Sequence, residues 1–431
     1  MQVYKFGGAS VKDAAAVKNV TAILQHNNFN EKVVVISAMG KTTNALEEVV
    51  NQYYANNPNW ETTLDDVFEK HLVVIEKLYN KTISREVTAV SPLSFGEGQG
   101  VRLMIEAARK FLTENNSRNY NYIYDQVVSI GEYISTTIVS DYANSLGLKN
   151  TLLDVKQVLF TDNAYTEGIV DFKKTEEAIQ SKVAELVKTG FVITQGFVGS
   201  TPEGFAATLG REGSDYTASI FAYSLNAERM TVWKDVEGIM NADPKEFPDA
   251  QFISELTFHE AIEMTYYGAS VIHPKTIKPI QNKNIPLEVR SFVNSAKRGS
   301  VISANANTNF LPPVIIWKRG QVLLSFSAKD FSFIAEEHLS KVFATFAENR
   351  LRINLMQNAA ISFSITVDFK KEKIENIIQQ LTNDFSITRN DNLSLLTIRH
   401  YNPGIIDKLT KDKDILLRQI SRTTIQVLMR E

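Results

Sequence analysis

The sequence lacks cysteine, lacks an apolar run long enough to cross a membrane, and lacks an excess of charge of either sign. Without cysteine, disulfides, thiol nucleophiles and thiolate metal sites are excluded. A membrane helix needs roughly 20 apolar residues, and the N-terminus carries Lys5, Gly7 and Gly8 where a secretory signal would have its apolar core. The 46 basic and 49 acidic residues give no field suited to nucleic acid or an acidic membrane. We therefore expect a cytoplasmic protein that acts on small molecules and binds neither nucleic acid nor membrane.

The chain has 431 residues, too many for one hydrophobic core, because cores stop growing at roughly 250–300 residues. Short apolar runs alternate with helical stretches, which is typical of a parallel sheet with helices on both faces. Expected strands are 3–6, 33–37, 125–130, 151–154, 191–195, 230–234 and 286–291, and expected helices are 14–24, 44–54, 64–79, 100–112, 132–146 and 216–225. A polar run at 303–309, followed by Pro312-Pro313, indicates a linker after a first domain of residues 1–308.

The C-terminal part has a different order of elements. Residues 314–385 approximate a split βαβ unit, with strands at 322–326, 352–356 and 361–367 and helices at 335–349 and 371–381. Residues 386–431 start a second unit, with strands at 393–399, 416–420 and 424–429 and a helix at 403–409, but they stop before a final helix. An incomplete unit buries its apolar face only against a neighbour, so we expect pairing within the chain or with a second subunit of a homodimer.

Two loops near the N-terminus are candidates for anion and substrate binding. Lys5-Phe6-Gly7-Gly8 ends the first strand, where glycine amides and a lysine favour a bound anion; the alternative is a flexible turn with a solvated lysine. The segment Ser37–Thr43 is not a P-loop, because Val35 stands where that motif needs glycine. Its hydroxyls either bind a polar substrate or cap the next helix. The glycine-rich run 95–100 follows no strand and is interpreted as a loop.

The richest segment runs from Gln195 to Asp215. A strand ends at Gln195, a glycine-rich loop follows, and Arg211 stands between glycines just before a helix that Ser214 and Asp215 open. Arginine suits bidentate binding of a carboxylate or phosphate; the alternative is a solvated arginine beside a helix cap. The loop 233–244 follows a strand and is suited to a nucleotide base or ribose, whereas His273 before a proline is interpreted as a turn residue. No histidine pair or nucleophile elbow supports hydrolase chemistry.

In this order, the motifs resemble those of the aspartokinases of the amino-acid kinase family over residues 1 to about 302. The segments that carry the resemblance are 5–8, 37–40, 129–132, 196–197, 210–215, 234–243, 273–274 and 291–294. The C-terminal part resembles the paired ACT regulatory domains of such enzymes. The resemblance implies a three-layer α/β kinase fold with a mainly parallel sheet, followed by ferredoxin-like ACT units.

The resemblance also implies phosphoryl transfer from ATP, carried with Mg²⁺ on its phosphates, to the β-carboxylate of L-aspartate, in the pathway to lysine, threonine and methionine. The residues that match the family's catalytic positions are Lys5 and Asp215. Those implied for aspartate binding are Ser37, Thr43, Glu132, Phe197, Arg211 and Ser214. Those implied for nucleotide binding are Lys5, Gly7, Gly8, Ser10, Lys234, Asp235 and Lys245. No protein metal ligands are expected beyond these contacts.

The chain departs from the family pattern at several positions. Ala9 and Lys234 replace threonines and Ser270 replaces a lysine, which concerns nucleotide binding, and Lys234 or Lys275 is available to supply the missing charge. Asn354 stands where lysine-inhibited relatives have aspartate, so we expect weak or absent inhibition by lysine at the ACT units. The alternatives are a kinase for glutamate, carbamate or a nucleoside monophosphate, and a catalytically silent amino-acid sensor.

Overall fold

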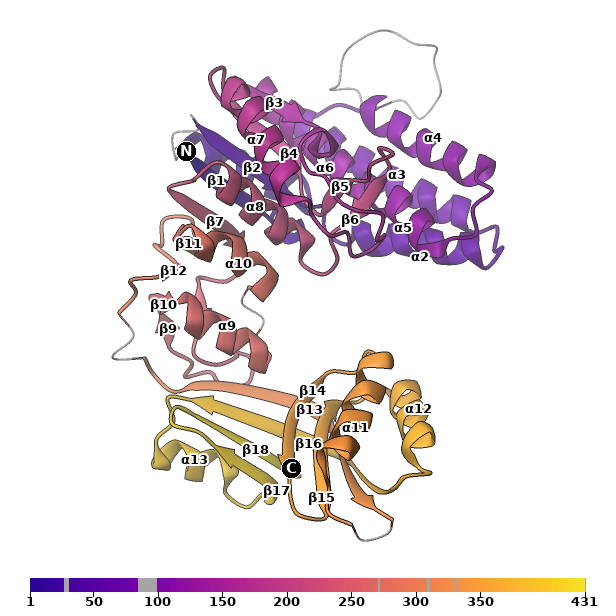
Figure 1. The fold of residues 1–431 in the computed structure, drawn as a ribbon. Helices are drawn as coiled ribbons and strands as arrows, with labels where there is room; N and C mark the ends of the chain where they lie inside the picture. Colours follow the sequence, from indigo (N-terminus) through magenta and orange to yellow (C-terminus); the bar gives the residue numbers. More distant parts are fainter. Residues whose placement is uncertain (27–30, 84–98, 270–271, 308–310, 330–331, 431) are drawn as a thin grey trace. The chain divides into compact units, whose positions relative to one another are not determined.

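The computed structural model describes residues 1–26, 31–83, 99–269, 272–307, 311–329 and 332–430 (Figure 1). Its contacts divide the chain into two compact units. The first comprises Met1–Ile239, Ser254–Ile262 and Val271–Thr308, and the second comprises Met240–Ile253, Glu263–Ser270 and Asn309–Glu431. Part of the run 95–100 and Ser270, both considered in the sequence, lie outside the described residues.

The first unit is built on a sheet whose strand order, in the described part of the chain, is β10-β12-β11-β7-β1-β2-β4-β3. The strands are β1 (Gln2–Phe6), β2 (Lys32–Ile36), β3 (Asn150–Leu153), β4 (Phe191–Gln195), β7 (Arg229–Lys234), β10 (Glu255–Thr257), β11 (Leu287–Ser291) and β12 (Ser300–Ser303). Each neighbouring pair is parallel except β11 with β12. The carboxyl ends of β1, β2, β4 and β7 therefore lie at one edge of the sheet.

Helices cover both faces of this sheet (Figure 1). They are α1 (Ala14–His26), α2 (Thr42–Tyr54), α3 (Trp60–Tyr79), α4 (Gln99–Glu114), α5 (Tyr120–Val128), α6 (Ile130–Ser145), α7 (Phe172–Leu186), α8 (Gly213–Ser224) and α10 (Pro274–Asn282), while α9 (Phe258–Tyr267) is divided between the two units. The short strands are β5 (Val198–Ser200), which pairs with β6 (Ala206–Thr208), and β8 (Ile239–Met240), which pairs with β9 (Phe252–Ile253).

The alternation of side chains along β1 decides which helices it meets. Tyr4 and Phe6 belong to a core cluster with side chains of α1 to α6. Val3 and Lys5 point to the opposite face, because successive strand residues alternate, and α8 packs there against β1, β2 and β7. The expected three-layer arrangement with a mainly parallel sheet is confirmed, and Lys5 is directed toward α8.

One expected strand is wrong. Residues 125–130 are not a strand, because α5 occupies Tyr120–Val128 and α6 follows from Ile130. Val127 and Val128 are buried against the helical layer of the core. A short apolar run is compatible with either a buried strand or a buried helix, and the packing of this layer selects the helix.

The second unit contains an antiparallel sheet of order β14-β15-β13-β16-β18-β17 in the described residues. Its strands are β13 (Val314–Ala328), β14 (Ile353–Asn358), β15 (Ser362–Asp368), β16 (Phe385–Arg399), β17 (Asp414–Ile420) and β18 (Thr424–Arg430). Its helices are α11 (Glu336–Glu348), α12 (Lys371–Leu381) and α13 (Pro403–Thr410). These elements form the expected ferredoxin-like region.

The strands β13 and β16 are much longer than expected from the sequence. The start of β13, Val314–Lys318, pairs with the end of β16, Leu395–Arg399, and the remainder of β13 pairs with β15 and with the start of β16. Ile315 and Trp317 pack against the cluster formed by β16, β18 and α13. The expected second unit, residues 386–431, therefore pairs within the chain, with a strand segment from the start of the expected first unit, residues 314–385.

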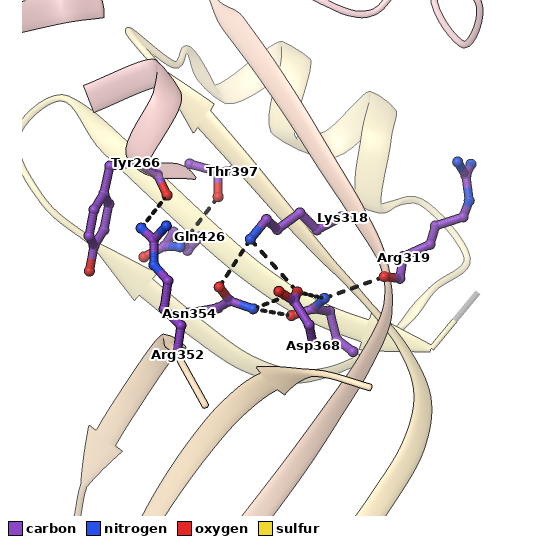
Figure 2. Close-up of polar contacts among 9 residues, drawn as sticks. Tyr266, Lys318, Arg319, Arg352, Asn354, Asp368, Thr397 and Gln426 are labelled. Carbon is purple, nitrogen blue, oxygen red and sulfur yellow. Dashed lines mark hydrogen bonds and ion pairs between the residues drawn. The ribbon is translucent and has the colours of Figure 1, made fainter. Parts of the chain in front are cut away.

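A polar network joins three strands of this sheet (Figure 2). Lys318 Nζ donates to Asn354 Oδ1 at 3.0 Å and lies 3.7 Å from Asp368 Oδ1. Asn354 Nδ2 donates to Gln321 Oε1 at 2.8 Å and to Asp368 Oδ1 at 2.9 Å. Arg352 donates to the carbonyl of Tyr266 and lies over its ring. Both polar atoms of the Asn354 amide are thus engaged by groups of this chain.

No helix among the described residues is long and apolar enough to span a membrane.

The aromatic centre of the second unit provides a stability test. Phe326 is fully buried, with edge-to-face contacts to Phe346 and Phe385. We expect Phe326→Ala to lower the free energy of unfolding of this unit by about 3–5 kcal/mol, because a large core side chain leaves a cavity. The matched control is Phe333→Ala, since Phe333 is 74% exposed, and we expect a change within about 0.5 kcal/mol. Urea denaturation followed by circular dichroism measures both, and equal losses would contradict the packing described.

Candidate active site

A cavity of ≈ 680 Å³ opens at the carboxyl ends of the parallel strands of the first unit. Residues from the ends of β1 and β7 and from the loops after β2 and β4 line it, together with the start of α8. In open α/β sheets, ligands bind at this edge. The predicted site residues that line the cavity are Lys5, Gly7, Gly8, Ser10, Ser37, Thr43, Glu132, Phe197, Arg211, Ser214, Asp215, Lys234 and Asp235.

Lys5 and Asp215 form a buried ion pair at the centre of the lining. Lys5 Nζ lies 2.5 Å from Asp215 Oδ1, and the two side chains are 11% and 4% exposed. Lys234 Nζ lies 4.0 Å from Asp215 Oδ2. Burial alone would raise the pKa of Asp215, but the two ammonium groups and the hydrogen bond from Lys5 hold that pKa below its ordinary value. Two ammonium groups thus face one carboxylate in the lining of the cavity.

The turn after β1 brings backbone close to this charge. Gly8 begins a short 3₁₀ turn, Gly8–Val11, and its carbonyl accepts from the N–H of Gly40. A Cβ at Gly8 would lie 2.8 Å from the carbonyl oxygen of Ala38, so only glycine fits between the two loops. Ser10 is buried, and its hydroxyl donates to the carbonyl of Gly7. The two loops that follow β1 and β2 are thereby joined beside Lys5.

Glu132, in the first turn of α6, supplies a buried carboxyl group to the cavity. Its Oε1 accepts from the N–H of Ala38 at 3.4 Å, whereas Oε2 has no hydrogen-bond partner in the described structure. Burial raises the pKa of Glu132 to about 8, against the lowering effects of hydrogen bonds and of Lys5. A buried carboxyl oxygen without a partner is suited to a ligand that donates hydrogen bonds and carries positive charge.

Arg211 reaches the cavity from the loop between β6 and α8. Its side chain is exposed, while the neighbouring Gly213, Ser214 and Asp215 are buried. Glu212 has φ +55° at the start of α8, and its Oε2 accepts from the N–H of His273 at 3.0 Å. His273 is the N-cap of α10, which agrees with its interpretation as a turn residue. The cavity therefore holds a carboxyl group and a guanidinium group in addition to the lysine pair.

Lys245 and Lys275 are not among the residues that line the cavity. Lys245 belongs to the second unit. Lys275 Nζ donates to the carbonyl of Leu209 at 2.9 Å, and burial lowers its pKa. The ammonium of Lys275 thus supports the loop that carries Arg211.

Several lining residues were missed in the sequence. They are Tyr124, Thr166, Glu167, Thr208 and Glu212. Tyr124 lies on α5, where a strand was expected, and Thr166 and Glu167 belong to a segment without a recognised motif. Thr208 and Glu212 lie within the segment from Gln195 to Asp215, close to Arg211, so their position in the sequence could have indicated them.

The raised pKa of Glu132 predicts how stability changes with pH. The Glu132 carboxyl group keeps its proton to a higher pH in the folded than in the unfolded chain. Its contribution to the free energy of unfolding is therefore fully present below the ordinary carboxyl pKa and is lost as the pH rises through about 8. We expect Glu132→Gln to be more stable than the wild type by at least about 1 kcal/mol at pH ~8.5, with little gain at pH ~5. Urea denaturation of the ligand-free protein measures this, with the exposed Glu48→Gln as control. Parallel pH profiles of wild type and Glu132→Gln would contradict it.

Comparisons with known proteins agree with this geometry. The model of the amino acid kinase family matches residues 1–291. Bifunctional aspartokinase/homoserine dehydrogenase 2 (chloroplastic) of Arabidopsis thaliana is 29% identical over 301 residues, 70% of this chain and 32% of that protein, so the chain spans about a third of such a relative. Lysine-sensitive aspartokinase 3 of Escherichia coli is 29% identical over 367 residues, 85% of this chain and 78% of that protein.

The fold is shared with a solved structure. The crystal structure of E. coli aspartokinase III in complex with aspartate and ADP superposes with a TM-score of 0.81 at 24% identity, covering 100% of this chain and 96% of that chain.

Proposed function

Because this chain belongs to the amino acid kinase family, we propose that it transfers the γ-phosphoryl group of ATP to the β-carboxylate of L-aspartate, yielding ADP and 4-phospho-L-aspartate. The relative in E. coli that shares its fold was solved with aspartate and ADP. The chain also covers most of the length of the E. coli enzyme named aspartokinase 3. The bifunctional relatives are three times longer than their match here, and only the kinase activity is proposed.

One observation carries the proposal: the cavity that holds the lysine pair also holds both an unpartnered buried carboxyl oxygen and an exposed arginine. Glu132 supplies the first and Arg211 the second. An α-amino acid is a zwitterion, so it requires one negative and one positive partner. Glu132 would bind the α-ammonium group, whose charge favours the ionised carboxylate, and Arg211 would bind the α-carboxylate bidentately. Ser37, Thr43, Phe197 and Ser214 would shape the remainder of the acceptor pocket.

The reaction needs positioning and charge stabilisation more than proton transfer. The β-carboxylate of aspartate is ionised at neutral pH, so one of its oxygens attacks the γ-phosphorus without a general base, and the bond to the leaving oxygen of ADP breaks. Charge spreads over the equatorial phosphoryl oxygens in the loose transition state. Lys5, oriented by Asp215, would neutralise this charge, and the amides of Gly7 and Gly8 would hold the oxygens.

The nucleotide would lie along the loops after β1 and β7. Ser10, Lys234 and Asp235 line that part of the cavity, and Lys245 remains proposed from the family resemblance. The ammonium groups of Lys5 and Lys234, which both line the cavity, would attract the phosphates of ATP. Mg²⁺ would be carried by those phosphates and would neutralise part of their charge. The cytoplasmic location and the homodimer stay predictions.

The first test is ATP-dependent aspartyl hydroxamate formation, with glutamate assayed in parallel. We expect activity on aspartate, a fall of about 10²–10³-fold in Lys5→Met because a transition-state contact is lost, and a strong fall in Arg211→Ala. Lys41→Met is the matched control, because Lys41 is exposed and does not line the cavity, and we expect activity within about twofold. Activity with neither acid would favour the silent sensor, and equal activity with glutamate would overturn the assigned substrate.

We further propose that free lysine regulates this chain weakly or not at all. The relative in E. coli is named lysine-sensitive, but here Asn354 offers an amide in place of a carboxylate. Lys318 already donates to its oxygen, and its nitrogen already donates to Gln321 and Asp368 (Figure 2). A ligand ammonium would have to displace the ammonium of Lys318.

Titration calorimetry with lysine tests this prediction, and the activity assay is repeated in parallel with lysine in large excess over the protein. We expect no heat of binding at micromolar lysine and no loss of activity, because the amide oxygen already accepts from the ammonium of Lys318, which would repel a second ammonium group. Micromolar affinity would overturn the prediction.

A further inference from the structure

Asp125, on α5, is a buried carboxylate that does not line the cavity but contacts two segments that do. Its Oδ2 accepts from the backbone N–H of Thr166 at 2.8 Å and from the backbone N–H of Thr208 at 2.8 Å. Its Oδ1 accepts from the hydroxyl of Thr208 at 2.7 Å. One side chain therefore satisfies three donors, one on the loop of Thr166 and two on Thr208 at the end of β6, and both segments line the cavity.

The first of these loops has a backbone that requires support. Thr166 has φ +70°, a left-handed conformation that is rare for a β-branched residue and persists only where its surroundings hold it. The bond from its N–H to Asp125 is one such restraint. Gly168 N donates to the carbonyl of Thr208 at 2.9 Å, so the two loops are also joined to each other. Thr166 and Glu167 thus keep their places in the wall through contacts that converge near Asp125.

The second loop carries the arginine. Two residues, Leu209 and Gly210, separate Thr208 from Arg211 along the chain, and Gly210 has φ +75°. The loop is also held from the other side, by Lys275 at the carbonyl of Leu209 and by the N–H of His273 at Glu212. The backbone of the loop is therefore fixed at both ends, while the Arg211 side chain stays exposed to receive a ligand. A binding group on a pre-ordered backbone loses less conformational freedom when it binds.

The chemistry of a carboxylate is required at this position. All three groups that face Asp125 are hydrogen-bond donors, and an ionised carboxylate is acceptor-only. Asparagine has the same shape, but an NH₂ group would replace the oxygen that accepts from the Thr208 hydroxyl, and the two N–H groups would bond to a neutral amide oxygen in place of a carboxylate. Burial raises the pKa of Asp125 to about 6, against three hydrogen bonds that favour the ionised form, so the carboxylate is mostly ionised at neutral pH.

We propose that Asp125 is a positioning residue that sets the affinity of the site for the amino-acid acceptor, by holding the loop of Arg211 and the segment of Thr166 in their binding geometry. This inference rests on the proposed function for its kinetic readout. Asp125 acts through its neighbours and does not touch the acceptor, and the nucleotide side of the cavity is built on other loops. The effect of its loss is therefore confined to the acceptor.

The kinetic test compares Asp125→Asn, Thr208→Val and the double variant in the full-length chain. We expect the KM for aspartate to rise at least about tenfold in Asp125→Asn, while the KM for ATP stays within about twofold. The double variant should raise the KM by less than the product of the single effects, because both changes remove the same contact. Asp162→Asn is the matched control: Asp162 accepts from the N–H groups of Ala164 and Ile169 in the same loop but is exposed, and we expect an unchanged KM.

Hydrogen exchange provides a readout that needs no substrate. In Asp125→Asn, the backbone amides of peptides that contain Thr166 and Thr208 should exchange at least about tenfold faster, and Asp162→Asn should leave Thr208 unchanged. If wild type phosphorylates no aspartate but the exchange result holds, the proposed function fails and the positioning role stands. An unchanged KM for aspartate in an active Asp125→Asn, or an equal rise of both KM values, overturns the inference. If Asp125→Asn does not fold, Thr208→Val alone decides by the same criteria.

Discussion

The buried ion pair between Lys5 and Asp215 is the interaction on which the site depends. It joins the carboxyl end of β1 to the first turn of α8, two elements more than 200 residues apart in the chain. Both side chains are almost fully buried, so the removal of either would leave an uncompensated charge in a medium of low dielectric. The pair places a cation at the edge of the sheet and fixes the start of α8, and with it Ser214 and the loop of Arg211.

Lys234 adds a second positive charge beside the ion pair of Lys5 and Asp215. Its ammonium lies 4.0 Å from the same aspartate, so two lysines share one carboxylate. Glu132, which also lines the cavity, is buried, and its Oε2 has no hydrogen-bond partner in the described structure. A buried carboxyl group and cationic side chains therefore lie in the lining of one cavity, as the proposed binding of an amino-acid acceptor requires. The buried groups are costly in the empty protein, which is the usual condition of a site built for a charged ligand.

The antiparallel sheet of the second compact unit is made from two ACT-like parts whose segments interleave along the chain. The strands β13 and β16 each have a long run of residues that pair with different neighbours at their two ends. The sequence divides this part of the chain into two consecutive units, and that division leaves the second unit, residues 386–431, without a partner for its apolar face. The partner is the start of β13, Val314–Lys318, whose Ile315 and Trp317 complete the cluster around α13. Local pattern does not show this pairing, because the segments that pair are about 80 residues apart.

The sequence alone was sufficient to predict the bounds of several elements and the main charged residues of the candidate site. The period of the apolar residues placed β4 (Phe191–Gln195) and α12 (Lys371–Leu381) at their observed bounds, and the glycines and charged residues at strand ends indicated Lys5, Arg211 and Asp215, since such residues have few local structural reasons to stand there. Tertiary structure decided what depends on distant partners. It made residues 120–128 a helix, because the apolar layer around them, and not their own pattern, selects the conformation. It brought Asp125 to Thr166 and Thr208 and raised the pKa of Glu132, because burial and hydrogen bonding arise only when the chain is folded.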